Sequence, residues 1–435
     1  MKNYSFSFIK VIAILFPSFF LSLDFAIDYP DFEIIINNNP YPEDIFIHST
    51  GDDNQFMALL DSELEVKWYI VSTSGKGWDF KVNNNNKVTY FRKPSNDWTP
   101  SGGGLFYVMD QSMHEVDALE CANNFKADYH DIQYTDGGGY ILQAYAKEQI
   151  DIPQTEVVDT ANVLILQEFD QEHNLIMEWK NFEHMDIEDY IDQFNLMGPY
   201  LHWMHGNSIE IDNDENIFIS NRTMSEIIKF NRQTGALIWR LGGPMNDFTF
   251  IDDPLNGPNR QHDARRLDNG NIMIFDNGDQ RDPPLTRVVE YEIDETQMTA
   301  TLVWQHSHPN GYVSLNQGCA QRLENGNTLI SWGGVSGHGQ IITEVDYSGS
   351  SVLEIEYPVG NTSYKVRKDD WEFDVNLLPA DLNLDENVDI LDVIRTVDFI
   401  LSENEPDPFY LFKSDLDKSG SVDVLDILII LDIIL

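Results

Sequence analysis

A turn-and-strand pattern that recurs along most of the chain is the feature that most restricts its fold. Segments that end in an aromatic residue recur as LDSELEVKWY, FDQEHNLIMEW, FNRQTGALIW, EIDETQMTATLVW and VDYSGSSVLEIEY. Polar turns between apolar residues recur as VNNNNKVTYF, YTDGGGYILQ, IDNDENIFIS, LDNGNIMIF and LENGNTLIS. Such turns are typical of β-hairpins, and the apolar residues beside them alternate with a period of two, as in half-buried strands.

The spacing of these copies predicts a β-propeller. Successive copies lie about 55 to 65 residues apart, which is longer than the roughly 40–50 residues of common propeller repeats. Four short antiparallel strands per copy and about six copies predict an all-β fold, a six-bladed β-propeller over residues 24–373. An array of β-sandwiches is the alternative, but the regular pairing of aromatic segments with hairpin turns favours blades. Ring closure predicts that strands before Asn54 pair with the last blade near Tyr357, because open blades leave exposed edges.

One stretch, MDIEDYIDQFNLM at 185–197, interrupts the repeat and predicts a short helix. It leads to Tyr200 and Trp203, whose rings offer faces on which an aromatic ligand could stack. Packing of both rings in the core is the alternative reading.

The N-terminus and the composition bear on location and partners. Residues 1–23 place two lysines before the apolar run VIAILFPSFFLSL, which predicts a secretory signal peptide, with an uncleaved anchor as the alternative. No other stretch is apolar enough to span a bilayer, so we expect an exported protein, periplasmic, cell-surface or extracellular, that is not an integral membrane protein. The net charge of −46 disfavours nucleic acid and anionic membranes as partners. Cys121 and Cys319 predict two buried thiols rather than a disulfide or a metal site.

Three histidines and one arginine are the candidate catalytic residues. His130, His205 and His262 each precede the hairpin turn of their copy by a similar distance. Equivalent positions in a propeller are related by its rotation axis, so we expect the three to meet at one mouth of the central channel. A neutral imidazole can attack a sulfuryl or phosphoryl centre, a second histidine can protonate a leaving phenolate, and Arg281 could grip anionic oxygens with its planar fork. A single histidine of this kind would more often be structural.

The ordered motifs HGNSIEIDNDENIFISNR, IWRLGG, QHDARRLDNGN, FDNGDQR and QGCAQRLENGNTLISWGG resemble the arylsulfotransferases of the bacterial arylsulfate sulfotransferase type. The resemblance implies a six-bladed propeller that moves a sulfuryl group from a phenolic sulfate donor to a phenol acceptor. It also implies a sulfohistidine intermediate and no nucleotide cofactor. By motif match, His205 and His262 would be channel histidines and Arg281 the sulfate-binding arginine.

Within that resemblance we expect His262 to be the nucleophile, His205 the acid–base partner and His130 a supporting group. The family has a further channel histidine, and the matching slot in the next copy carries Gln317. The nearby candidates for the sulfated residue are His306, His308 and His338. A non-catalytic propeller that binds a ligand or a glycan is the rival hypothesis.

The C-terminal residues 378–435 predict a small all-α calcium-binding domain. The segments DLNLDENVDILD and DLDKSGSVDVLD each carry oxygen-bearing residues at the ligand positions of a twelve-residue calcium loop, and each runs into an apolar helix. The predicted Ca²⁺ ligands are Asp381, Asn383, Asp385, Asn387, Asp389 and Asp392 in the first loop and Asp415, Asp417, Ser419, Ser421, Asp423 and Asp426 in the second. Glu386 replaces the turn glycine that the second loop keeps as Gly420. The pair resembles a dockerin, which implies a cohesin-type partner.

Overall fold

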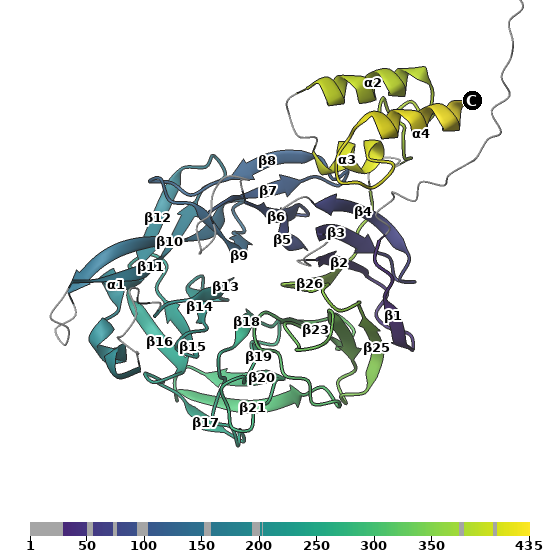
Figure 1. Cartoon of the computed structure of the whole chain (residues 1–435). Helices are drawn as coiled ribbons and strands as arrows, with labels where there is room; N and C mark the ends of the chain where they lie inside the picture. The colour runs from purple at the N-terminus through teal and green to yellow at the C-terminus, as the bar shows by residue number, and fades with distance from the viewer. Residues whose placement is uncertain are drawn as a thin grey trace, which may run out of the picture.

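Six sheets arranged in a ring form the body of the protein, as Figure 1 shows for the computed structural model. The structure describes residues 29–49, 55–72, 76–93, 103–151, 158–193, 201, 203–373, 378–402 and 407–435. The predicted signal peptide, residues 1–23, lies outside the described residues. The six sheets confirm the predicted six-bladed propeller.

Each blade is a sheet whose strands run from the channel to the outer rim, and its inner strand is named first. Blade one contains β26 (Val366–Asp369), β2 (Asp44–His48), β3 (Gln55–Leu60) and β4 (Val66–Ser72). Blade two contains β5 (Lys76–Val82), β6 (Val88–Arg92), β7 (Leu105–Met109) and β8 (Glu115–Leu119). Blade three contains β9 (Ala127–Tyr134), β10 (Tyr140–Asp151), β11 (Val158–Phe169) and β12 (Leu175–Lys180).

The other three blades follow the same order. Blade four contains β13 (Gly206–Ile211), β14 (Ile217–Asn221), β15 (Glu226–Phe230) and β16 (Leu237–Gly242). Blade five contains β18 (His262–Arg266), β19 (Ile272–Asp276), β20 (Arg287–Asp294), β21 (Thr299–His306) and the added β17 (Thr249–Ile251). Blade six contains β22 (Cys319–Arg322), β23 (Thr328–Trp332), β24 (Ile341–Val345), β25 (Ser351–Glu356) and β1 (Glu33–Asn37). The inner strands contact one another in a closed ring around the channel.

The aromatic residues that recur in the sequence fill the spaces between blades. Trp68, Trp179 and Trp239 lie on the outer strands of blades one, three and four, and all three are buried. The indole of Trp179 stacks on Phe230 of the next blade with 4.5 Å between ring centroids. Burial of a side chain of this size stabilises the fold by roughly 1.5–3 kcal/mol or more. The repeated aromatic position therefore marks the contact between neighbouring blades.

Both ends of the propeller contribute to ring closure. Strand β1 pairs with β25, with Glu33 opposite Glu356, which confirms for β1 the predicted pairing of the strands before Asn54 with the last blade. Near it, the Tyr29 and Tyr357 hydroxyls lie 2.6 Å apart. A second closure comes from β26, which follows the last blade in sequence and forms the inner strand of blade one by pairing with β2.

The interruption of the repeat differs in detail from its prediction. The α-helix α1 comprises only Asn181–His184, and Ile187–Gln193 forms a 3₁₀ helix. Trp203 is fully buried in the core between blades three and four, so its ring offers no face to a ligand. Its neighbour Tyr200 lies outside the described residues. The two cysteines are free and buried, as predicted.

A small helical module packs against the outside of the propeller beside blades one and two (Figure 1). It contains α2 (Ile390–Leu401), α3 (Pro408–Ser414) and α4 (Val424–Ile434). The Phe412 ring lies 6.2 Å from that of Trp68, and Leu411 joins the same apolar cluster. None of the helices in the described part of the chain is both long enough and apolar enough to span a bilayer.

Candidate functional site

The inner strands bring the three predicted histidines to one mouth of the channel. His130 lies on β9, His262 begins β18 and His205 immediately precedes β13. The His130 and His205 rings are 4.6 Å apart and perpendicular. Tyr364, just before β26, lies 5.4 Å from the His130 ring and 6.4 Å from the His262 ring. Sequence reasoning did not single out this tyrosine, because it lies beyond the last copy of the repeat.

The hairpins show which positions are equivalent. Leu267 donates to the Asn271 carbonyl and Leu323 to the Asn327 carbonyl, so each begins the same turn in its own blade. Counting back from that residue, the slot of His262 corresponds to Gly318 in blade six, and not to Gln317 as the sequence suggested. A Cβ atom at Gly318 would lie 2.3 Å from the Phe275 ring, and its φ is +93°. Blade six therefore has no side chain in this slot.

The hydrogen bonds around His262 determine its tautomer. Its Nδ1 lies 2.7 Å from Asn277 Oδ1. The amide nitrogen of Asn277 donates to the Ser314 and Gln317 carbonyls at 3.1 and 3.0 Å, so the oxygen must face the imidazole. The proton is then on Nδ1, and Nε2 keeps its lone pair. Burial lowers the pKa of His262 to about 3, although the bond to Asn277 opposes that effect. The ring is therefore neutral near pH 7, the form that a nucleophile requires.

This assignment predicts that His262 does not titrate in the physiological range. In ¹⁵N-resolved NMR spectra of the imidazoles, its ring should keep the Nδ1–H tautomer from about pH 8 down to about pH 5. The pKa of this imidazole is ~6.5 in the unfolded chain and is lowered by burial to about 3 in the folded chain. The contribution of His262 to stability is thus complete above ~6.5 and decreases as the pH falls from there. A midpoint near ~6.5 in the folded protein would contradict the assignment.

The other two histidines have different surroundings. His130 is buried, and its Nδ1 bonds the carboxylate of Asp128, which also accepts from Gln143 Nε2 at 2.6 Å. A carboxylate at Nδ1 fixes the ring orientation, so His130 is suited to a supporting role. His205 is only partly buried, and its backbone N–H donates to Asn221 Oδ1 at 3.0 Å. Of the three, His205 is thus the residue with the greatest solvent exposure.

The alternative histidines form a separate group in blades five and six, at the end of β21, just after it, and in the loop between β23 and β24. His306 ends β21, and its ring lies 6.3 Å from Trp332. His308 lies 5.3 Å from the same indole, and His338 Nδ1 is 2.8 Å from Glu356 Oε1. These residues lie in or beside strands other than the inner ones, whereas the three predicted histidines are on or beside the inner strands.

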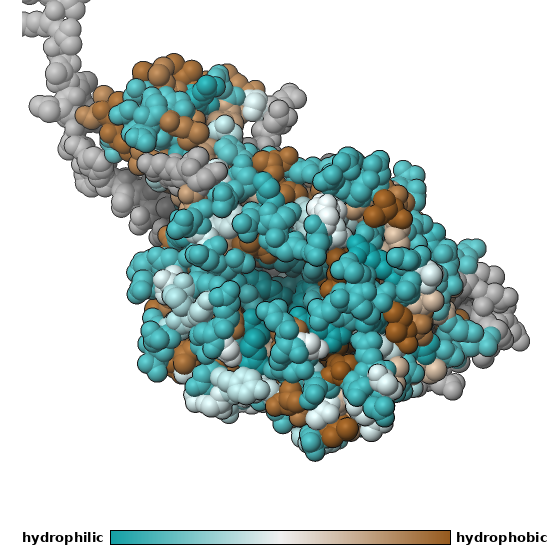
Figure 2. Space-filling model, turned by 180° about the vertical axis from the view of Figure 1, so that it is seen from behind, coloured by the Kyte–Doolittle hydropathy of each residue, from teal (hydrophilic) through white to brown (hydrophobic). Residues whose placement is uncertain are grey.

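A layer of buried ion pairs lies next to the histidines along the channel. Asp131 accepts from Arg265 at 2.7 Å and pairs with Lys81 as well. Burial alone would raise the pKa of Asp263, but the guanidiniums of Arg367 and Arg265 outweigh it and hold the pKa below its usual range. Beyond this layer, a cavity of about 670 Å³ opens among the hairpins at the opposite mouth. Figure 2 shows a hollow at the centre of one face, surrounded by hydrophilic residues. This cavity is therefore distinct from the histidine mouth.

Arg281 pairs with a buried carboxylate of its own blade. Its Nη1 and Nη2 donate to the two carboxylate oxygens of Asp276 at 3.0 and 2.8 Å, and Nη2 also donates to the Gly257 carbonyl at 2.8 Å. Asp276 is fully buried at the end of β19, and a buried carboxylate requires cationic partners. The planar fork of Arg281 is therefore paired within blade five, and its assignment as the sulfate-binding residue stays a prediction.

Two further arginines lie at the histidine mouth. The backbone N–H of Arg222 donates to the His205 carbonyl at 2.9 Å, and Arg260 precedes His262 by two residues. Their guanidiniums approach Asp279 at 3.6 and 3.7 Å. Neither arginine stood out in the sequence. The one available signal was that Arg222 ends the motif that begins at His205 and that Arg260 lies directly before QHD.

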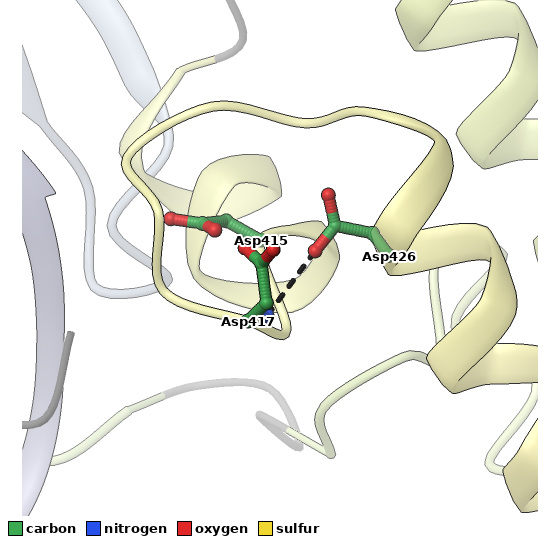
Figure 3. Close-up of side chains that lie close together, drawn as sticks. All are labelled: Asp415, Asp417 and Asp426. Carbon is green, nitrogen blue, oxygen red and sulfur yellow. Dashed lines mark hydrogen bonds between the residues drawn. The ribbon is translucent and has the colours of Figure 1, made fainter. Parts of the chain in front are cut away.

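The second predicted calcium loop brings three carboxylates together, as Figure 3 shows. One carboxylate oxygen from each of Asp415, Asp417 and Asp426 lies within 4.8 Å of the others. Asp417 Oδ2 is buried and has no hydrogen-bond partner within the described part of the chain. Hard oxygen donors at this spacing fit Ca²⁺, and an orphaned buried carboxylate oxygen is consistent with a cation as its missing partner.

The first loop repeats the backbone pattern of the second. The side chain of Asp392 accepts from Leu382 and Asp389, as that of Asp426 does from Leu416 and Asp423. Glu386 has a φ of +65° where Gly420 has +84°. A side chain is unfavourable in this left-handed conformation, so the first loop is strained at the residue that replaces glycine. The other predicted ligands are spread along the two loops: Asn383, Asp385 and Asn387 in the first, Ser419 and Ser421 in the second, with Asp389 and Asp423 as the N-caps of α2 and α4.

Comparison with known proteins gives one family for most of the propeller. The family model described as Arylsulfotransferase (ASST) matches residues 33–365. The arylsulfate sulfotransferase AssT of Escherichia coli O6:H1 is similar at 28% identity, over 32% of this chain and 29% of that relative. The alignment thus spans less than a third of the length of AssT.

Solved structures that resemble the propeller are more distant in sequence. A protein of unknown function from Bacteroides caccae has a TM-score of 0.48 at 11% identity, covering 75% of this chain and 99% of its own. The periplasmic gluconolactonase PpgL of Pseudomonas aeruginosa has a TM-score of 0.44 at 8% identity, covering 76% and 100%. Similarity at this level says nothing about activity.

Proposed function

The chain belongs to the arylsulfotransferase family, and from that premise we propose that it transfers a sulfuryl group from a phenolic sulfate ester to a phenolic acceptor. The observation that supports this most is the state of His262, which is neutral and has Nδ1 bonded to Asn277. Its Nε2 is therefore available as a nucleophile, and two further histidines lie at the same mouth. No nucleotide sulfate donor takes part in the proposed reaction.

Two displacements at sulfur make up the proposed reaction. Nε2 of His262 attacks the sulfur atom, an N–S bond forms, and the S–O bond to the aryl group breaks. His205 gives a proton to the departing phenolate, which is a strong base and leaves slowly without assistance. In the second step the acceptor phenol returns a proton to His205, its oxygen attacks the sulfur, and the N–S bond breaks. His130, oriented by Asp128, supports the arrangement of the rings.

A transfer assay tests the proposal. Purified protein with 4-nitrophenyl sulfate should release nitrophenol only slowly, and addition of phenol should accelerate the release with formation of phenyl sulfate. Equal release without acceptor would indicate a sulfatase instead. No release under either condition would favour the rival hypothesis of a propeller that binds a ligand without catalysis.

The proposal extends to both ends of the chain. Residues 1–23 carry the features of an export signal, so we place the mature protein outside the cytoplasm. The C-terminal module would then tether the propeller to a cohesin-type partner as a dockerin does. In support, Figure 2 shows hydrophobic residues on the surface of this module. Apolar side chains are exposed at matching places on its two longer helices: Ile390, Leu391 and Ile394 on α2, and Val424, Leu425 and Leu428 on α4.

Calcium binding by this module gives a prediction that does not depend on catalysis. Calorimetry should find two Ca²⁺ per chain, with the tighter site in the loop that keeps Gly420. The double variant Asp415→Ala, Asp426→Ala should lose the tighter site, and the matched variant Asp381→Ala, Asp392→Ala should lose only the weaker one. Uptake that neither double variant alters would refute the assignment, as would an absence of calcium uptake.

A further inference from the structure

Three charged side chains at the histidine mouth are poorly matched to one another. Arg222 and Arg260 stand 3.6 and 3.7 Å from Asp279, beyond the range of about 2.7–3.2 Å for a hydrogen bond. Among the residues that the structure describes, the buried atoms Arg222 Nε, Arg260 Nε and Asp279 Oδ1 have no hydrogen-bond partner. Buried polar atoms normally have a hydrogen-bond partner. The pair of Arg281 with Asp276, at 3.0 and 2.8 Å, shows that a hydrogen-bonded ion pair forms in the same blade. The geometry of these three groups is thus not that of a well-formed salt bridge, and it leaves polar atoms available to a ligand.

Strand order places the three side chains beside the candidate nucleophile. Arg222 follows the last residue of β14, which pairs with the start of β13 next to His205. Asp279 lies in the loop after β19, whose Phe275 is opposite His262. Arg222 also reaches toward blade six, where its Nη2 donates to the Leu315 carbonyl at 2.9 Å. The guanidiniums therefore come from blade four and from the segment that leads into β18, and both approach Asp279.

We propose that Arg222 and Arg260 together bind the sulfate group of the donor, and that Asp279 is a competing anion that occupies them when no donor is present. The inference rests on the proposed function and assigns to the anion site two arginines beyond the one that the motif match suggested. Two guanidiniums outnumber one carboxylate, so their charge is incompletely neutralised. A sulfate ester carries several acceptor oxygens and matches the fork of donors that each guanidinium presents.

The role of Asp279 makes the proposal distinguishable from a structural salt bridge. If Asp279 only held the loop together, its removal would weaken the site along with the loop. If it competes with the ligand, replacing it by the uncharged asparagine should free both guanidiniums and strengthen anion binding. Removal of either arginine should have the opposite effect. The carboxylate variant should thus raise the affinity for sulfate, and the arginine variants should lower it.

The test is calorimetric titration of the full chain with inorganic sulfate. Arg222→Ala and Arg260→Ala should each weaken sulfate binding by roughly tenfold or more, and Asp279→Asn should tighten it several-fold. Arg240→Ala is the matched control, because Arg240 also pairs loosely, at 3.6 Å with Asp189, but lies on the outer strand β16. Its sulfate affinity should equal that of the parent protein, and thermal unfolding should show that all four variants are folded.

Three results would overturn the inference: no sulfate binding by the parent protein, arginine variants that bind as the parent does, or weaker binding by Asp279→Asn. The assay separates this inference from the proposed function. If the protein binds sulfate as described but transfers no sulfuryl group, the anion site is supported and the proposed transferase activity is refuted. If both arginine variants transfer sulfuryl groups with an unchanged KM for the donor, the anion site is refuted and the proposed activity is not.

Discussion

Replacing His262 by glutamine should abolish acceptor-dependent sulfuryl transfer, with a loss in kcat of about 10⁴-fold or more. Loss of the nucleophile removes the covalent route altogether, and glutamine offers no nitrogen lone pair at the place of Nε2. Its amide can still donate to Asn277 Oδ1, the partner of His262 Nδ1, so the fold should be retained. The measurement is the rate of phenyl sulfate formation from 4-nitrophenyl sulfate and phenol, with thermal unfolding as the check on structure.

The matched control is His205→Gln, which removes the proposed acid–base partner and leaves the nucleophile. General acid–base catalysis contributes about 10²–10⁴-fold, so this variant should be slow but active. The loss in transfer rate of His205→Gln should be smaller with donors whose phenolates are weak bases, because such phenolates leave without being protonated. A His262→Gln variant that transfers at a rate near that of the parent would refute the assignment, and an equal defect with every donor would contradict the role of His205.

A chain truncated after Ser363 should fail to give a folded monomer, because it lacks β26, the strand that completes the inner ring. Val366 is opposite Ile47 of β2, and Lys368 Nζ is buried with Glu344 at 2.7 Å. Without β26, the inner edge of blade one would be open, and Glu344 and Asp263 would lose buried cationic partners. Loss of one member of such a pair costs about 3–5 kcal/mol, and a free edge strand promotes aggregation.

The control for this truncation ends after Phe373, which keeps β26 and omits only the helical module. Size-exclusion chromatography and thermal unfolding should find a folded monomer for residues up to 373 and aggregated or unfolded protein for residues up to 363. A soluble, cooperatively folded monomer from the shorter chain would show that β26 does not close the ring.

The propeller could be predicted because its determinants are local. Hairpin turns such as Asp268 to Gly270 and the aromatic residues between blades, such as Trp179 and Trp239, repeat in the sequence itself. Strand β26 could not be predicted in the same way. Its four residues, VRKD, have no hairpin turn of their own, and they become an inner strand only by pairing with β2 from the other end of the chain.

The candidate site was likewise predictable where local sequence determines it and not where long-range contacts do. Position in the repeat was enough to bring His130 and His262 to one mouth, because equivalent residues of the blades share one height in the channel. The role given to Arg281 depended on its partner, and sequence spacing does not reveal that Asp276 is buried and takes up its fork. Arg222 and Arg260 could not be recognised in advance, because only the folded loops bring them to a common carboxylate.

Location of the sulfuryl group on the protein tests the central claim most directly. Protein incubated with 4-nitrophenyl sulfate alone, without acceptor, should accumulate the intermediate, which can be digested and mapped by mass spectrometry under mild, non-acidic conditions. We predict a single added sulfuryl group on His262, and its removal when phenol is supplied. A label on His306, His308 or His338, or no label in a protein that transfers sulfuryl groups, would contradict the account.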